Sequence, residues 1–372
     1  MANLLDYISW RGDLTFSQDP PNEVDALVFS SLVYIQYGGR VEANPLEPVT
    51  LAEAAEDFLC REDIPSRIRV KLDLELLRLA AASARFGQMK ICKYRDLYIP
   101  EQETQFAAMT CLLDDGTMFL AYRGTDYTLA GWKEDFNMTF QQTVPAQRLA
   151  EQYLRDVAME YDYPIRMGGH SKGGNLAVFA AARCSPMVQP RILEVYNQDG
   201  PGFTNYLMGD PGYLAMVPRI YTLIPQSSVI GMLLEHEEEY HVVKSKTVSL
   251  LQHDPYSWDV MGKAFVRMDA LTANSEFLDA TIKAWFADMT NEERNQLVDV
   301  MFGLLGTGGV DMVQEIISPK NILNYIKTLR GDANLRRVLS SEFTGLIESA
   351  KRTKALFEEK KEAEKLLAEG NQ

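Results

Sequence analysis

The chain has 372 residues, of which 46% are hydrophobic, and its 52 acidic and 37 basic side chains give a formal net charge of −15. A chain of this length can bury a large core, and we expect one α/β domain at residues 1–258 followed by a helical region at 259–372. The excess of negative charge disfavours nucleic acid and anionic lipid surfaces as partners.

We expect the protein to be cytoplasmic. Residues 1–6 lack the basic and apolar regions of a signal peptide, and no run of about 18 apolar residues predicts a transmembrane segment. The cysteines show no Cys-x-x-Cys spacing, which indicates reduced core thiols rather than disulfides or a zinc site. They are Cys60, Cys92, Cys111 and Cys184. The sequence predicts no cofactor and no metal.

The first part of the chain is predicted to be an arm at residues 1–20 followed by helices. Apolar residues recur at helical spacing over 22–37, 50–60 and 66–85. Two apolar runs then flank Asp114-Asp115-Gly116, which predicts a hairpin of strands near 107–113 and 117–123. We expect the sheet to continue through 165–170, 192–197, 219–224 and the region 242–251.

A polar turn and a loop follow the second hairpin strand. Residues 122–126 read Tyr-Arg-Gly-Thr-Asp. Taken alone, this turn is typical of an Asp126 side chain that bonds its own backbone. A second interpretation comes from enzymes that transfer acyl groups through a serine. Their oxyanion is bound by backbone N–H groups, and one of these lies in a loop that follows a strand earlier in the chain than the serine. Thr125 is the candidate for that donor.

The most informative motif is Gly-His-Ser-Lys-Gly, which begins at Gly169. Gly-x-Ser-x-Gly marks a nucleophile elbow, a cramped strand-to-helix turn in which Gly169 and Gly173 avoid clashes and Ser171 projects its hydroxyl. The alternative is an ordinary Gly-rich turn. A predicted helix at 146–160, the strand from Ile165 and an Ala-rich helix at 175–184 give the order that an elbow requires.

Lys172 follows the serine, and its backbone N–H is the candidate for the second oxyanion donor. We expect its side chain to be exposed. The ammonium then either favours an anionic substrate or is simply a solvated group at the start of the helix.

Several motifs together resemble a known family. They are residues 3–7, 10–13, 22–25, 122–126 with Trp132, Glu134 and Asp135, 169–177, 197–203 and 252–258. The central motifs resemble the class 3, fungal-type lipases, and roughly residues 3–260 resemble the Mbeg1-like family of bacterial lipase-like proteins. The resemblance implies an α/β-hydrolase fold with a C-terminal helical extension, and it implies little about the substrate.

His253 is the candidate general base. It follows a strand-like run at 248–252 and precedes a turn, which is where an α/β-hydrolase keeps this histidine. His170 lies inside the elbow and is expected to pack under the serine. His236 and His241 flank a predicted solvated acidic turn and are weaker candidates. A surface histidine without a catalytic role is the alternative for His253.

The acid of the triad is less well specified. Asp199 follows the strand at 192–197 and therefore lies at the carboxyl end of a strand, where such sites form. In class 3 lipases the acid follows the next strand instead, but residues 219–231 contain no carboxylate, and Ser228 stands near that position. We favour Asp199, with Asp254 or no acid at all as alternatives.

Beyond residue 258 the pattern becomes helical, and helices are predicted at 258–287, 291–305, 310–330 and 334–368, with a break at Gly306–Gly309. Residues 351–369 mix Lys and Glu with apolar side chains, which is typical of a solvated amphipathic helix. Binding of a partner or homo-oligomer formation through these helices is the alternative. The helical region is otherwise expected to be a lid over Ser171 or a docking surface.

The sequence thus predicts a serine hydrolase that cleaves an ester, thioester or lipid acyl bond of a small-molecule or lipid substrate. The alternative is a degenerate hydrolase fold retained for binding or scaffolding, which the missing acid after 219–224 favours. Neither the natural substrate nor its acyl-chain length follows from the sequence.

Overall fold

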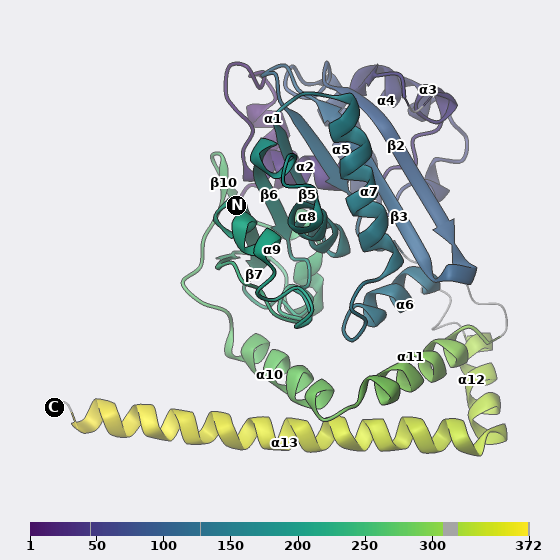
Figure 1. The fold of residues 1–372 in the computed structure, drawn as a ribbon, viewed down its shortest axis with the longest axis vertical. Coiled ribbons are helices and arrows are strands. Elements are labelled where there is room, and N and C mark those ends of the chain that lie inside the picture. The colour runs from purple at the N-terminus through teal and green to yellow at the C-terminus, as the bar shows by residue number, and fades with distance from the viewer. Residues whose placement is uncertain (45, 127, 308–318, 371–372) are drawn as a thin grey trace. The chain divides into compact units, whose positions relative to one another are not determined.

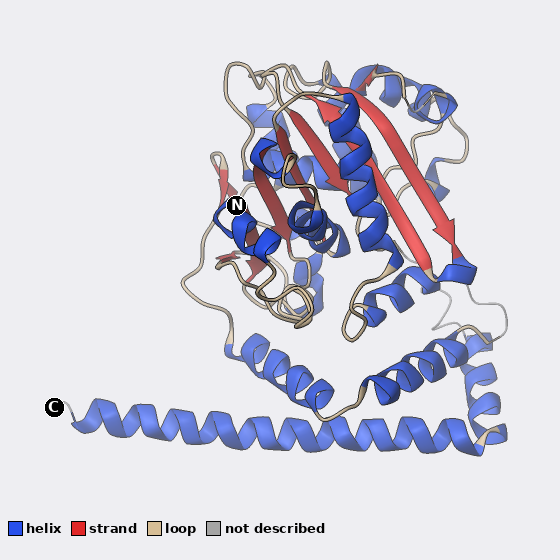
Figure 2. Ribbon diagram, in the orientation of Figure 1, coloured by secondary structure: helices blue, strands red, loops and turns tan. Residues whose placement is uncertain are grey.

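The structure is a computed structural model that describes residues 1–44, 46–126, 128–307 and 319–370. Contacts divide the chain into two compact units, Met1–Ala270 and Leu271–Gln372. The first unit holds the β-sheet and the second is helical (Figures 1 and 2). The first unit therefore extends past residue 258, where we expected the helical region to begin.

The described part of the first unit contains an eight-stranded sheet whose strands follow the order of the sequence. The antiparallel strands are β1 (Val49–Thr50), β2 (Lys90–Ile99), β3 (Thr104–Leu112) and β4 (Met118–Tyr122). The strands that continue in parallel from β4 are β5 (Ile165–His170), β6 (Ile192–Gln198), β7 (Ile220–Pro225) and β8 (Tyr240–Val243). The carboxyl ends of parallel strands meet at one edge, which is where α/β proteins bind ligands.

Helices cover both faces of this sheet (Figure 1). One layer consists of α1 (Leu4–Arg11), α2 (Glu23–Leu32), α3 (Gly39–Ala43), α4 (Leu51–Leu59) and α5 (Lys71–Ala82). The other layer is built around α7 (Pro145–Glu160), α8 (Lys172–Arg183) and α9 (Pro211–Met216). The α/β-hydrolase fold class with a helical C-terminal region is thereby confirmed.

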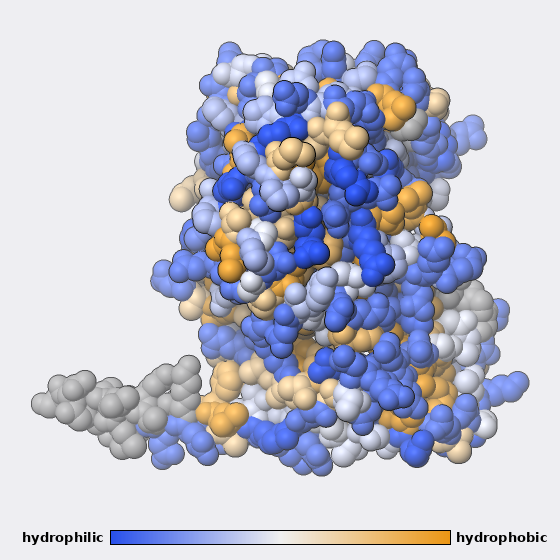
Figure 3. All heavy atoms as spheres, in the orientation of Figure 1, coloured by the Kyte–Doolittle hydropathy of each residue, from blue (hydrophilic) through white to orange (hydrophobic). Residues whose placement is uncertain are grey.

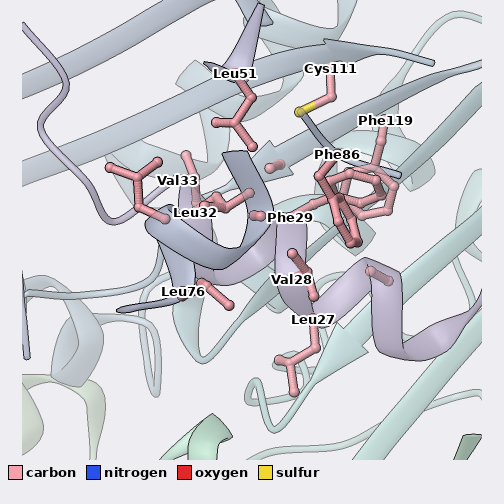
Figure 4. Close-up of a cluster of buried hydrophobic side chains, with 14 of the residues drawn as sticks. Leu27, Val28, Phe29, Leu32, Val33, Leu51, Leu76, Phe86, Cys111 and Phe119 are labelled. Atoms are coloured by element: carbon pink, nitrogen blue, oxygen red, sulfur yellow. The ribbon is translucent and has the colours of Figure 1, made fainter. Parts of the chain in front are cut away.

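Aromatic side chains fix α2 to the sheet. The ring of Phe29 lies 4.5 Å from that of Phe119 on β4 and 5.7 Å from that of Phe86, measured between centroids (Figure 4). All three side chains are buried. Burying a phenylalanine side chain stabilises a fold by roughly 1.5–3 kcal/mol, so this cluster anchors the layer behind the sheet.

Helix α8 is buried on all sides. Its residues from Lys172 to Ala182 are inaccessible because it lies on β5 and β6 and is covered by α7 and α9. A helix without a solvent face needs small apolar residues, which explains its run of alanines. The elbow at its N-terminus therefore rests on a rigid support.

Several predicted elements are confirmed. The hairpin at Asp114–Gly116, the helix at 50–60, the helix at 146–160 and the strand at 192–197 all occur close to their expected bounds. The helices expected at 22–37 and 66–85 are shorter and run from Glu23 to Leu32 and from Lys71 to Ala82.

Other expectations were wrong. The supposed arm contains α1, which begins with an Asn3 cap and buries Leu4, Tyr7 and Ile8 in the core. The long strand β2, which lies between β1 and β3, was not predicted. The loop after Thr125 contains α6 (Leu129–Asn137), capped by Thr128. Of the four thiols, Cys60 is exposed, and all four are free.

The region before the C-terminal helices also differs from prediction. The run expected to be a strand before His253 is a 3-10 helix, Ser249–His253, followed by a second one, Pro255–Ser257. The first part of the helix predicted at 258–287 is a hairpin, β9 (Val260–Met261) and β10 (Ala264–Phe265). This hairpin belongs to the first unit, because Val260 and Phe265 are buried in its core.

The described part of the second unit contains α10 (Ala273–Ala287), α11 (Asn291–Leu305), α12 (Pro319–Gly331) and α13 (Ala333–Gly370). The long helix α13 contacts the other three, and the ring of Phe277 lies 5.9 Å from that of Phe357. The start of the helix predicted at 310–330 and part of the glycine break lie outside the described residues. None of the described helices has the length and hydropathy needed to cross a membrane.

Hydrophilic side chains cover most of the molecular face that Figure 3 shows.

Candidate active site

Ser171 forms the turn between β5 and α8. Its backbone has φ +59° and ψ −136°, which a residue with a side chain rarely adopts. The Ser171 N–H donates to Gln198 O at 2.9 Å, and its carbonyl accepts from Gly174 N at 2.9 Å. These bonds from β6 and α8 hold the serine in a strained conformation, as expected at a functional turn.

The two motif glycines allow the elbow to close. A Cβ on Gly169 would lie 2.2 Å from the carbonyl carbon of Gly173, and a Cβ on Gly173 would lie 2.1 Å from the carbonyl oxygen of Tyr122. A side chain at either position would therefore separate β4, β5 and α8. The Gly-x-Ser-x-Gly spacing thus has the steric cause that the elbow interpretation requires.

Asp199 and His253 are in direct contact. The Nδ1 atom of His253 lies 2.7 Å from Oδ2 of Asp199. Asp199 directly follows β6, has φ +55° and is only 1% exposed, whereas the His253 side chain is 26% exposed. The other carboxylate oxygen, Oδ1, accepts from Ser228 Oγ at 2.5 Å and from Gly231 N at 3.1 Å. Both carboxylate oxygens of Asp199 thus have hydrogen-bond partners, and the His253 side chain is partly accessible to solvent.

His170 connects the elbow to His253. The two rings lie 4.5 Å apart, and Nε2 of His170 is 2.7 Å from the carbonyl oxygen of His253. Because a carbonyl only accepts, Nε2 of His170 must carry the proton. Burial, with the charges of His253 and Arg69, holds the pKa of His170 well below its usual value. A neutral His170 therefore positions the backbone of His253, a role that the sequence did not indicate.

The remaining candidates for acid and base lie elsewhere. The Asp254 carboxylate accepts from Tyr256 N at 3.2 Å and so caps its own turn. His236 is buried and lies 3.2 Å from Glu238 Oε1 and 3.0 Å from Gly231 O. His241 is exposed on β8.

The acidic turn between these histidines is exposed at Glu237 and Glu239, as expected, but not at Glu238. Glu238 is buried and accepts hydrogen bonds from Thr222 and Tyr213. Although burial opposes it, the hydrogen bond and charge of His236 help to lower the pKa of Glu238 to about 2. Glu238 and His236 therefore help to fix the position of Gly231, whose N–H donates to Asp199.

Thr125 lies beside the serine. A Cβ on the preceding Gly124 would be 3.0 Å from the Cβ of Ser171, so the loop carrying Thr125 passes close to the nucleophile. Thr125 Oγ1 donates to Asp135 on α6, with 2.6 Å to each carboxylate oxygen. Burial raises the pKa of Asp135 to about 6, although the charge of Lys172 opposes this shift.

The backbone N–H of Lys172 belongs to the first turn of α8, where amides have no carbonyl of their own helix to bond. We expected the Lys172 side chain to be exposed, but it is only 1% accessible. The ammonium donates to Glu134 Oε2 at 2.9 Å and to Gln105 O at 3.2 Å. Although burial lowers the pKa of Lys172, the charges of Glu134 and Asp135 outweigh this and raise it. The ammonium therefore cannot attract a substrate from solvent.

The described residues contain no group of three or more His, Cys, Asp or Glu side chains suited to a metal ion. The candidate site is made of Ser171, His253 and Asp199, with the backbone amide of Lys172 nearby.

Comparisons with known proteins found one family model and several solved structures that are similar to this chain. A family model described as Mbeg1-like matches residues 80–303. No curated protein matches the chain. Among solved structures, the native Rhizomucor miehei lipase propeptide complex is 16% identical, with a TM-score of 0.36, over 59% of this chain and 67% of its own. A mutant form of MDLA from Penicillium cyclopium is 13% identical, with a TM-score of 0.37, over 67% of this chain and 87% of its own.

Proposed function

The chain belongs to the Mbeg1-like family, and we propose that it is a serine hydrolase that cleaves an ester, thioester or lipid acyl bond. The observation that carries this proposal is the bond between His253 and Asp199 next to a strained serine elbow. Ser171 is the proposed nucleophile, His253 the base and Asp199 the acid.

In the first step, His253 Nε2 takes the hydroxyl proton of Ser171 while Oγ attacks the acyl carbon. Asp199 fixes the tautomer, because its carboxylate engages Nδ1–H and leaves the Nε2 lone pair for the proton. The imidazolium formed in this step is stabilised by the same carboxylate. The N–H groups of Thr125 and Lys172 would hold the developing oxyanion.

The tetrahedral intermediate then collapses. The bond to the leaving alcohol or thiol breaks, and His253 gives that group the proton it took from Ser171. A water molecule next attacks the acyl-enzyme, its proton passes to His253, and the free acid leaves as Ser171 recovers its proton. No outside oxidant or cofactor is needed for this sequence.

The competing hypothesis is a degenerate fold kept for binding. Its main support was the missing acid after the 219–224 strand. Asp199, one strand earlier, contacts His253, so the absence of a carboxylate there does not argue against catalysis. A strained, glycine-dependent elbow also has no evident use in a purely structural turn.

Hydrolysis of p-nitrophenyl acetate, butyrate and octanoate tests the proposal. We expect turnover by the purified full-length protein and its loss, by about 10³-fold or more, in Ser171→Ala. The matched control is Ser185→Ala, which removes an exposed hydroxyl and should leave kcat unchanged. Undiminished hydrolysis by Ser171→Ala would refute the assignment of the nucleophile.

A further inference from the structure

The two residues proposed to supply oxyanion donors are both anchored to one helix by their side chains. Lys172 pairs with Glu134, and Thr125 bonds Asp135, the next residue of α6. Lys172 also lies 3.6 Å from Asp135. One short helix thus contacts both sides of the proposed oxyanion hole.

Glu134 joins these parts to the rest of the fold. Its Oε2 accepts from Gln105 N on β3 at 3.2 Å and from Lys172, and its Oε1 accepts from Ala146 N in the first turn of α7 at 2.9 Å. Both charged side chains are only 1% exposed. The ion pair therefore connects α6, α8, β3 and α7 at a point that water does not reach.

Packing alone does not explain this pair. Apart from Asn175 and Arg183, the rest of α8 is apolar or glycine, and a buried ion pair is often replaceable by apolar side chains without loss of stability. Its location supplies the reason for a charged pair. Lys172 carries one proposed donor amide, and Glu134 is adjacent to the residue that holds the other.

We propose that Glu134 and the Lys172 ammonium are positioning residues that fix the two N–H donors relative to Ser171. This inference rests on the proposed hydrolase function. Neither charged group touches the reacting atoms, since Lys172 bonds Glu134 and Gln105 O, and Glu134 also bonds backbone amides of β3 and α7. Their effect is exerted on the backbone of the elbow and of the Thr125 loop, where small displacements of a donor strongly reduce rate.

The test compares Lys172→Met, Glu134→Leu and the double variant in the full chain. The single variants each leave one buried charge unpaired and should lower Tm. The double variant should recover most of that loss. Its kcat on p-nitrophenyl butyrate should nevertheless remain about 10- to 100-fold below wild type with KM unchanged, because the donors are no longer held.

The matched control removes another ion pair on the same strand as the elbow. Arg166 and Glu194 pair at 2.7 Å between β5 and β6. The variant Arg166→Met with Glu194→Leu should change Tm but keep kcat within about twofold. Should the Lys172 and Glu134 double variant fail to fold, Glu134→Gln keeps the shape of the side chain without its charge, and it should lower kcat several-fold at constant KM.

The outcomes separate this inference from the function on which it rests. If the wild type hydrolyses the ester and the folded double variant has a kcat within twofold of it, the positioning role is wrong and the hydrolase assignment stands. Equal kcat in wild type and Glu134→Gln leads to the same conclusion. A wild type that neither hydrolyses esters nor reacts with a fluorophosphonate overturns both.

Discussion

The Asp199 carboxylate bonds His253 through one oxygen and Ser228 through the other. Asp199 lies at the end of β6, and Ser228 follows β7, the strand after which class 3 lipases are expected to carry their acid. The acid and the hydroxyl thus converge from neighbouring strand ends. The carboxylate at the end of β6 reaches His253, and the hydroxyl that follows β7 is its hydrogen-bond donor.

This relationship predicts different effects for three substitutions. Asp199→Asn should lower kcat by about 10²- to 10⁴-fold, because an amide cannot both fix the His253 tautomer and stabilise the imidazolium. Ser228→Ala removes one hydrogen-bond donor to Asp199 and should lower kcat only a few-fold. Asp254→Asn, which changes the residue that caps the neighbouring turn, is the control, and its kcat should stay within about twofold of wild type. Steady-state kinetics with a p-nitrophenyl ester would measure all three, and a larger loss for Asp254→Asn than for Asp199→Asn would reverse the assignment.

Replacing each of three histidines by alanine should change kcat to a different extent. His253→Ala should lower kcat by about 10²- to 10⁴-fold as the general base is lost. His236→Ala should lower kcat by about tenfold. The carbonyl of Gly231 then loses its donor from His236, but the N–H of Gly231 still bonds Asp199. His241→Ala, at the exposed start of β8, should have no effect on kcat. The base would have to be reassigned if His236→Ala proved the most damaging of the three.

The steric account of the elbow predicts the effect of one methyl group. Gly173→Ala would place a Cβ 2.1 Å from the carbonyl oxygen of Tyr122. It should reduce the free energy of unfolding by about 1–3 kcal/mol and lower the activity as well. Gly303→Ala is the control, since nothing lies within 4 Å of its Cβ, and on a helix it should stabilise by up to ~1 kcal/mol. Chemical denaturation of both variants measures the contrast, and equal stabilities would contradict it.

The buried His170 predicts a pH dependence. Its pKa is depressed in the folded state, so between that value and the unfolded value near 6.5 the unfolded chain binds more protons. Stability from this group is therefore complete above pH 6.5 and is lost progressively as pH falls below it.

The matched variant isolates this effect from that of other groups. Asp135, whose pKa is raised to about 6, acts in the opposite direction, because its stabilising contribution is lost as pH rises from its unfolded pKa toward 6. Comparing the unfolding free energy of wild type and His170→Asn at pH 7 and pH 5 cancels Asp135. The loss between these pH values should be smaller in His170→Asn, and an equal loss would show that His170 is not the group involved.

Much of the fold follows from local pattern. The elbow is readable because its glycines and serine meet a steric demand that acts over a few residues, and the hairpin at Asp114–Gly116 because turn chemistry is local. Strand β2 was missed because it mixes charged and apolar residues, and its pairing with β3 decides its structure. The 3-10 helix before His253 has apolar residues that suit a strand equally well.

The site is readable only in part for a similar reason. The sequence identified Ser171, Asp199 and His253 as candidates, but the choice between Asp199 and Asp254 depends on a contact across 54 positions of sequence. The burial of Lys172 was unpredictable from the motif, because its partner Glu134 lies 38 residues away on another helix. The neighbouring Trp132, Glu134 and Asp135 were the only signal that could have indicated this link.

The most direct test of the central claim is the intact mass of the folded protein after incubation with a fluorophosphonate probe. An activated Ser171 predicts one probe adduct per chain, no adduct in Ser171→Ala, and little or none in His253→Ala. Folded wild-type protein that gains no mass, or a Ser171→Ala variant that still does, would contradict the claim that Ser171 is the nucleophile of a hydrolase.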